Sequence, residues 1–390
     1  MPTIRALMGF VLLGTSVFLM AAQRATEKGA ESARQVPLAE GWQIKSSCET
    51  QAKGEEISRA GFKEADWLAT RVPSTVMAAQ VNAGKFEDPY FGMNLRKIPG
   101  MDYPEKKLYS NLPVTADSPY KCSWWYRKDF EVPAGWGKSV WIHFNGINYR
   151  GNLWVNGKQV ATDEQIRGTY RTYDFDITPY IERGKRNAVA VETFIQTETD
   201  LGINFVDWQP TAADKNMGLW RDVYLAESGA VTLRNPAVLT HFTDDDLSLA
   251  ELTVVADLEN HSDAPVETLV RGSIGTIKFE KKFSLAAAEK TVVRFEAAAF
   301  PQLRIAKPAV WWPYQYGKPQ LHDLKMAALV GPSVSDEKAI RFGIREIDGK
   351  LNEKGFLQFR VNRKNILIRG GGWGVDVFYR EPKERLEKEF

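Results

Sequence analysis

Short apolar runs separated by polar turns are the feature that most constrains the fold of this chain. Clear examples are residues 139–144, 151–155 and 158–161. Asn156-Gly157 lies between the last two runs. The tight turn that joins two antiparallel strands needs positive φ at both central residues, so Asn-Gly at this place predicts a β-hairpin. Similar runs follow at 173–177, 188–194 and 222–226, and short strands at this spacing predict a β-sandwich.

Helical periodicity is scarce, which favours a mostly β fold. One short helix is predicted at 76–83, with Ser74 or Thr75 as its N-cap and Gly84 after its end. A second helix is predicted within 381–390, where Pro382 lies near the start and good helix formers follow it.

A second strand-rich region begins near residues 228–236. Leu252, Val254, Ala256 and Leu258 alternate with other side chains, as in a strand with one buried face. Further runs lie at 268–274, 277–285, 291–297 and 321–330. About 110 residues of short strands fit an immunoglobulin-like sandwich, which holds about 100 residues. The disulfide of antibody domains is not expected, because this region contains no cysteine.

A third pattern follows Arg341. Residues 356–361 and 365–369, with a turn at 362–364, predict a hairpin whose second strand leads into Gly370-Gly371-Gly372-Trp373. A strand, a glycine loop and a helix form one β/α unit. Such a unit needs neighbours, as in an eight-fold barrel of about 250 residues. We therefore interpret the end of the chain as the first unit of a truncated (β/α)₈ barrel.

The N-terminus has the features of an export signal. Arg5 supplies a short basic region, residues 6–20 are apolar, and Met20-Ala21-Ala22 offers small residues for cleavage. A buried helix or an uncleaved anchor is the alternative, but the run is shorter than the ~20 apolar residues of a spanning helix. We expect residues 1–25 to be a signal peptide, the protein to be exported to the periplasm or secreted, and no stable membrane span to form.

Composition excludes several classes of function. The chain has 51 Lys and Arg against 49 Asp and Glu, so the basic patch typical of nucleic-acid-binding proteins is not expected. Its four histidines lie far apart without metal-ligand spacing. The 12 tryptophans suit stacking on ring-shaped ligands. Cys48 and Cys122 are expected either to pair after export or to remain two buried thiols.

Six further motifs follow one another along the chain. They are WYRKDF at 125–130, FNGI at 144–147 with LWVNGK at 153–158, FDIT at 175–178, GLWRDV at 218–223, FGIR at 342–345 and RVN at 360–362. In this order they resemble glycoside hydrolase family two. That family has a sugar-binding jelly-roll sandwich, an immunoglobulin-like sandwich and a catalytic (β/α)₈ barrel. The resemblance implies a galactose-binding-like jelly roll at 36–229, an immunoglobulin-like sandwich at 230–342 and the start of the barrel at 343–390.

Loop motifs are similar to one branch of this family. DPYFGMN at 88–94, DWQP at 207–210 and DKNMGLW at 214–220 resemble β-mannosidases and exo-β-D-glucosaminidases. GGGW at 370–373 followed by Asp376 favours exo-β-D-glucosaminidases and plant endo-β-mannosidases. The resemblance implies an exported retaining exo-glycosidase that acts on β-linked aminosugars such as chitosan oligosaccharides. A β-mannosidase-type enzyme or a non-catalytic carbohydrate-binding protein is the alternative.

The resemblance also implies the chemistry. Retaining glycosidases use two carboxyl groups about 5–5.5 Å apart, and in this family both belong to glutamates on later barrel strands. We therefore assign no catalytic residue in this chain, expect both glutamates beyond Phe390 and expect the chain alone to be inactive. The reaction needs carboxylates and water, so no cofactor or metal is expected. The expected partner is a carbohydrate with β-linked glucosamine or mannose units, and the sequence does not indicate the oligomeric state.

Four residues are predicted to bind the substrate. Trp373 would stack on the pyranose ring, and Asp376 would bind sugar hydroxyls or a C2 ammonium, because active sites of these barrels lie in the loops after the strands. By resemblance, Asp207 and Trp208 of the first sandwich reach the same pocket. The alternatives are a structural turn in which Trp373 is packed and Asp376 caps the last helix, and a loop in which Trp208 is an anchor and Asp207 faces water.

Other residues of these motifs carry weaker expectations. Asp88, Tyr90 and Asn94 either line the same cleft or form a proline-containing turn. Trp220 is expected in the core, and Arg380 either pairs with Asp376 or is solvated.

Overall fold

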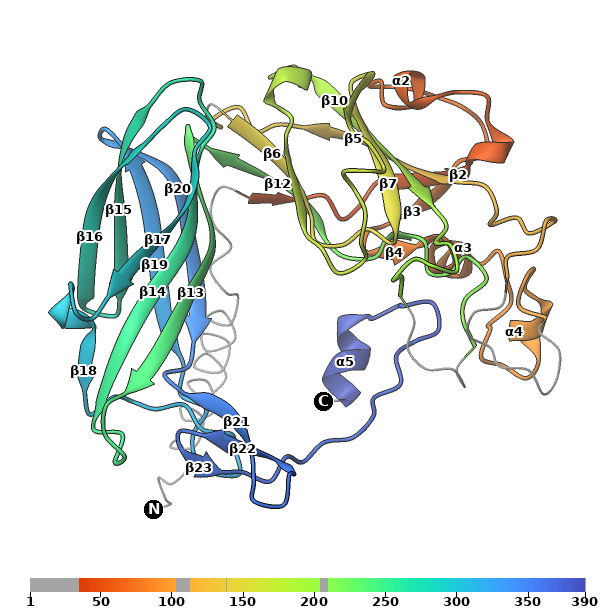
Figure 1. Ribbon diagram of the computed structural model, residues 1–390. Helices are drawn as coiled ribbons and strands as arrows, with labels where there is room; N and C mark the ends of the chain where they lie inside the picture. The colour runs from red at the N-terminus through yellow and green to blue at the C-terminus, as the bar shows by residue number, and fades with distance from the viewer. Residues whose placement is uncertain (1–34, 103–112, 138, 204–209, 390) are drawn as a thin grey trace, which may run out of the picture.

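The computed structural model describes residues 35–102, 113–137, 139–203 and 210–389, which form two β-sandwiches and a small third sheet (Figure 1). The chain passes from the first sandwich to the second and then to the small sheet. Residues 366–389, here called the closing segment, return to the first sandwich and end in α5 (Lys383–Glu389). Within the described ranges, no helix combines the length and apolar character needed to cross a membrane.

The first sandwich consists of a four-stranded sheet and a six-stranded sheet. Their strand orders are β1-β12-β6-β9 and β3-β2-β5-β10-β7-β8. The strands are β1 Gln35–Pro37, β2 Trp42–Ser46, β3 Leu68–Thr70, β5 Trp124–Glu131, β6 Ser139–Phe144, β7 Arg150–Val155, β8 Lys158–Ala161, β9 Tyr173–Asp176, β10 Arg186–Phe194 and β12 Val223–Ser228. The core between the sheets contains the fully buried side chains of Trp42, Tyr126 and Phe144.

The hairpin predicted at Asn156-Gly157 is confirmed. Asn156 and Gly157 have φ values of 47° and 81° and join β7 to β8. The Asn156 side chain also accepts a hydrogen bond from Ala188 N, at 2.9 Å, and donates one to Tyr180 O, at 2.8 Å. This turn residue therefore ties the hairpin to its neighbour β10.

The helix predicted near residue 76 is also confirmed. It is α3 (Val76–Asn82), and the Thr75 hydroxyl accepts a hydrogen bond from Ala78 N at its N-terminus. Gly84 follows the helix with φ +72°, a conformation that glycine adopts without strain. Other short elements of this domain are α2 Gly54–Ile57, α4 Asn94–Lys97, the 3₁₀ helices η1 Ser47–Glu49 and η2 Thr178–Tyr180, and β4 Ser74–Thr75, which pairs with β11 Gly218–Leu219.

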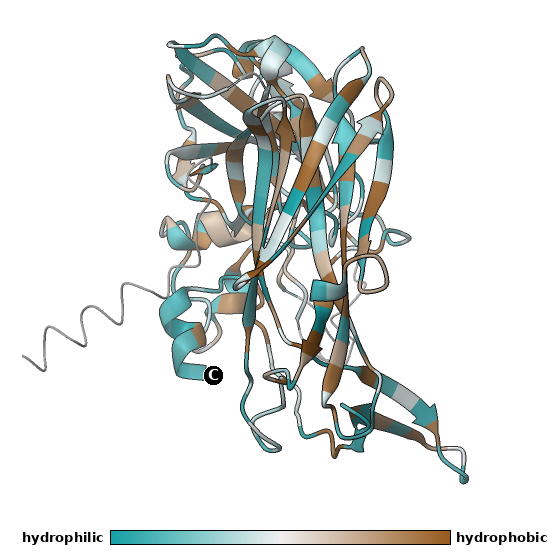
Figure 2. Ribbon diagram, turned by 90° about the vertical axis from the view of Figure 1, so that its left-hand side faces the viewer, coloured by the Kyte–Doolittle hydropathy of each residue, from teal (hydrophilic) through white to brown (hydrophobic). Residues whose placement is uncertain are grey.

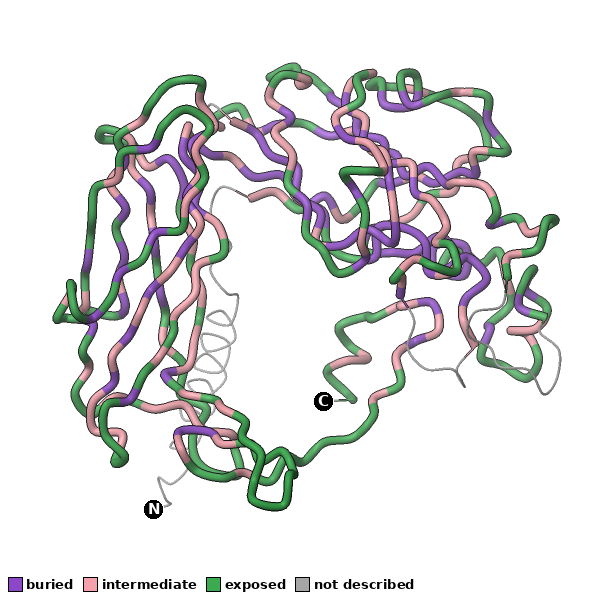
Figure 3. Tube along the Cα trace, in the orientation of Figure 1, coloured by how far each residue is buried: buried purple, intermediate pink, exposed green. Residues whose placement is uncertain are grey.

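The second sandwich has its own core. Its sheets have the orders β13-β14-β17, with β18 also paired to β14, and β16-β15-β19-β20. The strands are β13 Val231–Phe242, β14 Leu249–Asn260, β15 Val266–Ile274, β16 Ile277–Leu285, β17 Lys290–Glu296, β18 Arg304–Ala306, β19 His322–Val330 and β20 Ser333–Phe342. The alternation predicted for β14 is confirmed, because every second side chain from Ala250 to Leu258 is buried. Figures 2 and 3 show the same alternation of hydropathy and burial along these strands.

An ion pair connects the two sandwiches. The Arg234 guanidinium in β13 lies 3.1 Å from Asp174 of the first sandwich, and Asp336 in β20, also of the second sandwich, lies 2.5 Å from the same guanidinium. Beside this network, the rings of Trp141 and His261 lie 4.6 Å apart, and each belongs to a different sandwich. Both Arg234 and Trp141 therefore make contacts that join the two domains.

The small third sheet differs from the prediction in one respect. It contains β21 Ile347–Leu351, β22 Leu357–Val361 and β23 Lys364–Asn365, so the predicted hairpin forms, but the strand predicted at 365–369 ends at Asn365. A strand needs hydrogen-bonding partners along its length. The ladder ends where Ile366 N donates to Phe359 O, and no described strand flanks residues 367–369. The first barrel strand is therefore not formed here, and Leu367 and Ile368 are exposed.

The two cysteines pair, which decides between the alternatives left open by the sequence. Cys48 and Cys122 form a disulfide with their Cα atoms 6.0 Å apart. The bond joins the 3₁₀ turn Ser47–Glu49 to the segment that precedes β5 and closes a loop with a sequence separation of 74.

We predict that this disulfide stabilises the first sandwich. Closing a loop of this length lowers the entropy of the unfolded chain, so Cys48→Ser combined with Cys122→Ser should reduce the free energy of unfolding by up to about 4 kcal/mol. Guanidinium denaturation measures the change as a lower midpoint for unfolding of the first sandwich. Dithiothreitol treatment of the wild type should lower this midpoint by the same amount. An unchanged midpoint in both experiments would contradict the prediction.

Candidate functional site

The closing segment is anchored in the core of the first sandwich. Phe378 is fully buried and belongs to the same core cluster as Trp42 and Phe144. The Thr75 hydroxyl donates a hydrogen bond to Phe378 O at 3.1 Å across 303 residues of sequence. Thr75 is also the N-cap of α3. The same threonine therefore starts a helix of the first sandwich and holds the segment that carries Trp373 and Asp376.

Asp376 is buried and fully engaged by protein donors. Its Oδ2 accepts hydrogen bonds from the Tyr90 hydroxyl, at 2.9 Å, and from the guanidinium groups of Arg380 and Arg385, at 3.1 and 3.4 Å. Its Oδ1 accepts from Phe378 N, at 2.9 Å, and from Arg380 N and Nε, both at 3.3 Å. These bonds use both carboxylate oxygens. This geometry resembles the alternative in which Asp376 is part of a structural turn before the last helix, and its role as a sugar ligand stays a prediction.

Tyr90 connects the first sandwich to Asp376 through a hydrogen bond. Its hydroxyl donates to Asp376 and accepts a hydrogen bond from Val377 N at 3.2 Å. Burial, and then the negative charge of Asp376, raise the pKa of Tyr90 to about 12, so the hydroxyl remains a donor. Asp88 and Asn94 shape the loop around it: Asp88 accepts from Tyr90 N, at 3.0 Å, and Asn94 donates to Asp88 O, at 3.0 Å.

Trp373 is partly buried and lies beside α5. Its indole Nε1 donates a hydrogen bond to Glu389 at 2.7 Å, and Glu389 also accepts from Arg385 Nε at 2.6 Å. The flanking glycines lie in the loop that the sequence predicted, outside any helix or strand. A Cβ atom on Gly370, Gly371, Gly372 or Gly374 would meet no atom within 4 Å, because this stretch does not run against a barrel strand.

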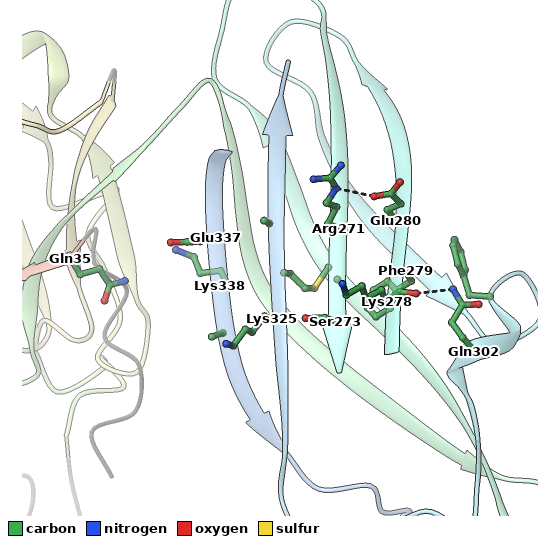
Figure 4. Close-up of a pocket in the computed structure, with 15 residues that line it drawn as sticks. Gln35, Arg271, Ser273, Lys278, Phe279, Glu280, Gln302, Lys325, Glu337 and Lys338 are labelled. Atoms are coloured by element: carbon green, nitrogen blue, oxygen red, sulfur yellow. Dashed lines mark hydrogen bonds and ion pairs between the residues drawn. The ribbon is translucent and has the colours of Figure 1, made fainter. Parts of the chain in front are cut away.

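The other two predicted sugar ligands, Asp207 and Trp208, lie outside the described residues and stay predictions. A cavity of about 280 Å³ is lined by Ile203 and Thr211 together with Gln196 and Lys215. A larger trough of about 1040 Å³ lies on the second sandwich (Figure 4). It runs across Arg271, Ser273 and Lys325, and neither Trp373 nor Asp376 lines it.

The DKNMGLW motif supports α3 and the closing segment. Asp214 is fully buried; its carboxylate accepts hydrogen bonds from Met77 N, at 2.8 Å, and from Asn216 N, at 2.9 Å. Burial raises the pKa of Asp214 to about 7, although these backbone donors lower it. Our sequence analysis missed this carboxyl, because an aspartate next to two alanines has no periodic pattern that would indicate its burial.

Trp220 lies in the core, as expected. It is 8% exposed, and its indole donates to Thr169 O at 3.1 Å. The rings of Tyr170 and Tyr379 pack against it edge-on, at 5.6 and 6.0 Å. Since Tyr379 belongs to the closing segment, Trp220 provides a second contact between this segment and the first sandwich.

Two family models match the chain in the order that this architecture requires. "Glycosyl hydrolase 2 galactose-binding domain-like" matches residues 42–204, and "Glycosyl hydrolases family 2" matches residues 231–345. The chain carries the N-terminal domains of glycoside hydrolase family 2. Within the described ranges of this family 2 chain, no group of three or more His, Cys, Asp or Glu side chains is arranged to hold a metal ion.

Known members of family 2 resemble the chain over most of its length. An exo-beta-D-glucosaminidase of Streptomyces avermitilis is 34% identical over 87% of this chain. A mannosylglycoprotein endo-beta-mannosidase of Lilium longiflorum is 26% identical over 86% of it. The crystal structure of the exo-chitosanase CsxA of Amycolatopsis orientalis superposes with a TM-score of 0.77 at 33% identity, over 90% of this chain. The chain spans only 36%, 37% and 38%, respectively, of these three proteins.

We predict a pH-dependent stability from Asp214. Its pKa of about 7 in the folded protein exceeds that of an unfolded aspartate, about 3.9, so the folded state binds the extra proton between these values. The free energy of unfolding should therefore fall as pH rises from about 4 to about 7, by at most about 1.4 kcal/mol per pH unit. Urea unfolding at several pH values gives the free energy of unfolding of the wild type and of Asp214→Asn. The contribution of Asp214 at each pH is the wild-type value minus the value for the variant.

Asp263→Asn, at an exposed position, is the control for the loss of one acidic side chain. The prediction would be contradicted if the free energy of unfolding of the wild type, minus that of Asp214→Asn, stayed constant or increased between pH 4 and 7.

Proposed function

We propose that this chain is the N-terminal part of an exported retaining exo-glycosidase that hydrolyses β-linked aminosugars, with chitosan oligosaccharides as substrate. The observation that carries the proposal is the likeness to two named enzymes, one an exo-beta-D-glucosaminidase and the other an exo-chitosanase. A complex of the second enzyme with PNP-beta-D-glucosamine superposes with a TM-score of 0.78.

The position of the closing segment supports this proposal. Trp373 is the predicted stacking residue, and an indole face suits the apolar face of a pyranose ring. The anchoring of Phe378 and Asp376 in the first sandwich limits where this indole can move. In a retaining enzyme, a second protein region would supply the acid/base and nucleophilic carboxyls, and this chain would supply part of the sugar pocket. Without those carboxyls the chain alone would not hydrolyse a glycoside.

Export is part of the same proposal. It is supported by the apolar run at residues 6–20 and by the Cys48–Cys122 disulfide, since disulfides persist in oxidising compartments.

A β-mannosidase-type activity is the second candidate. The observation that favours it is the likeness to the lily endo-beta-mannosidase. Glucosaminides and mannosides differ at C2, where an equatorial amine in one takes the place of an axial hydroxyl in the other.

Hydrolysis of paired chromogenic substrates tests the proposal. The full-length gene product should release p-nitrophenol from p-nitrophenyl β-D-glucosaminide with a kcat/KM at least about tenfold higher than from the β-mannoside, and the 390-residue chain should hydrolyse neither. A tenfold ratio corresponds to about 1.4 kcal/mol of transition-state discrimination.

The paired substrates also distinguish the aminosugar assignment from the β-mannosidase-type candidate. Activity on the mannoside alone would overturn the aminosugar assignment in favour of the second candidate, and activity on neither would overturn both. Hydrolysis by the chain alone would contradict the expected position of the catalytic carboxyls.

A further inference from the structure

We propose that Tyr90 is a positioning residue for the sugar site, because its hydroxyl fixes the orientation of Trp373 through Asp376, Arg385 and Glu389. The proposal rests on the proposed function, since it assigns Trp373 to sugar binding. It changes the role of Asp376 from a sugar ligand to a link between the first sandwich and the indole.

The first step is the origin of the contacts to Asp376. Phe378, Arg380 and Arg385 all belong to the closing segment, and their bonds to Asp376 organise this segment internally. Tyr90 belongs to the first sandwich, and its hydroxyl reaches the buried carboxylate at 2.9 Å. A hydrogen bond to a charged acceptor is stronger than one between neutral groups. The Tyr90 hydroxyl therefore makes a strong link between the first sandwich and the closing segment.

The second step is a continuous chain of polar contacts from Tyr90 to the indole. Arg385 Nη1 donates to Asp376 at 3.4 Å, and Arg385 Nε donates to Glu389 at 2.6 Å. Glu389 in turn accepts the hydrogen bond from Trp373 Nε1 at 2.7 Å. One guanidinium therefore bridges the carboxylate held by Tyr90 and the carboxylate that holds Trp373.

The third step concerns what removing the hydroxyl would disturb. Tyr90 as a whole residue is 51% exposed, but its hydroxyl lies against the buried carboxylate of Asp376. Its ring lies 6.3 Å from the Phe378 ring and 5.5 Å from the Arg380 guanidinium. Tyr90→Phe keeps this ring and removes the hydrogen bonds of the hydroxyl, including those with Asp376 and Val377. The fold should therefore persist, because Phe378 still anchors the closing segment, while the Asp376 side chain loses its hydrogen bond to the first sandwich.

Kinetics of the full-length gene product test the proposal. Tyr90→Phe should raise KM for p-nitrophenyl β-D-glucosaminide about tenfold and change kcat less than twofold, because ground-state stacking is weakened and the chemical groups are untouched. In a Trp373→Ala background, the same substitution should have no further effect on KM. Tyr173→Phe, which removes another tyrosine hydroxyl bond of the first sandwich, to Gly168 O, is the matched control and should leave KM unchanged.

A spectroscopic readout separates this proposal from the proposed function. In the chain labelled with 5-fluorotryptophan, the ¹⁹F resonance of Trp373, assigned with Trp373→Phe, should shift or broaden in Tyr90→Phe and stay unchanged in Tyr173→Phe. If the wild type hydrolyses no glucosaminide but this resonance responds, the proposed function fails and the link from Tyr90 to Trp373 stands. An unchanged resonance, an unchanged KM in an active enzyme, or an equal rise of KM in the Trp373→Ala background would overturn the proposal.

Discussion

The burial of Phe378 in the first sandwich is the contact on which the candidate site depends. Its ring lies in the first core, and its carbonyl accepts the hydrogen bond from Thr75. Asp376, two residues earlier, turns the chain by accepting from Phe378 N, and Tyr90 holds this carboxylate from outside. Because the side chain of Asp376 is only 2% exposed, a carboxylate at this place needs all of these donors. The hydrophobic anchor and the polar links therefore depend on one another.

The second sandwich and the small sheet lie between the first sandwich and the closing segment in the chain, and they connect Phe378 to the core in which it is buried. Arg234 of the second sandwich pairs with Asp174 of the first, and the Asn362 amide donates to Trp311 O and so ties the small sheet to the second sandwich. The chain then returns to the first sandwich at Phe378 (Figure 1). This route places the closing segment beside the first-sandwich residues Thr75 and Tyr90.

Patterns of neighbouring residues predicted the strands and short turns well, whereas contacts between residues far apart in the chain could not be predicted from the sequence. Asn156-Gly157 and Thr75 act through residues next to them in the chain, so their roles could be predicted. The strand expected at 365–369 failed because a strand depends on partners elsewhere. The pairing of Cys48 with Cys122 and the engagement of Asp376 by Tyr90 depend on folding across 74 and 286 residues, and no sequence pattern reports such proximity.

Native-state hydrogen exchange at the Phe378 amide tests most directly whether the closing segment is part of the first sandwich. The amide donates to a buried carboxylate next to a ring in the sandwich core. It should therefore exchange as slowly as amides of β5 and β10, through unfolding of the whole sandwich. Exchange at the rate of an unstructured peptide, while β5 and β10 remain protected, would show that the segment is not anchored and would contradict the site described above.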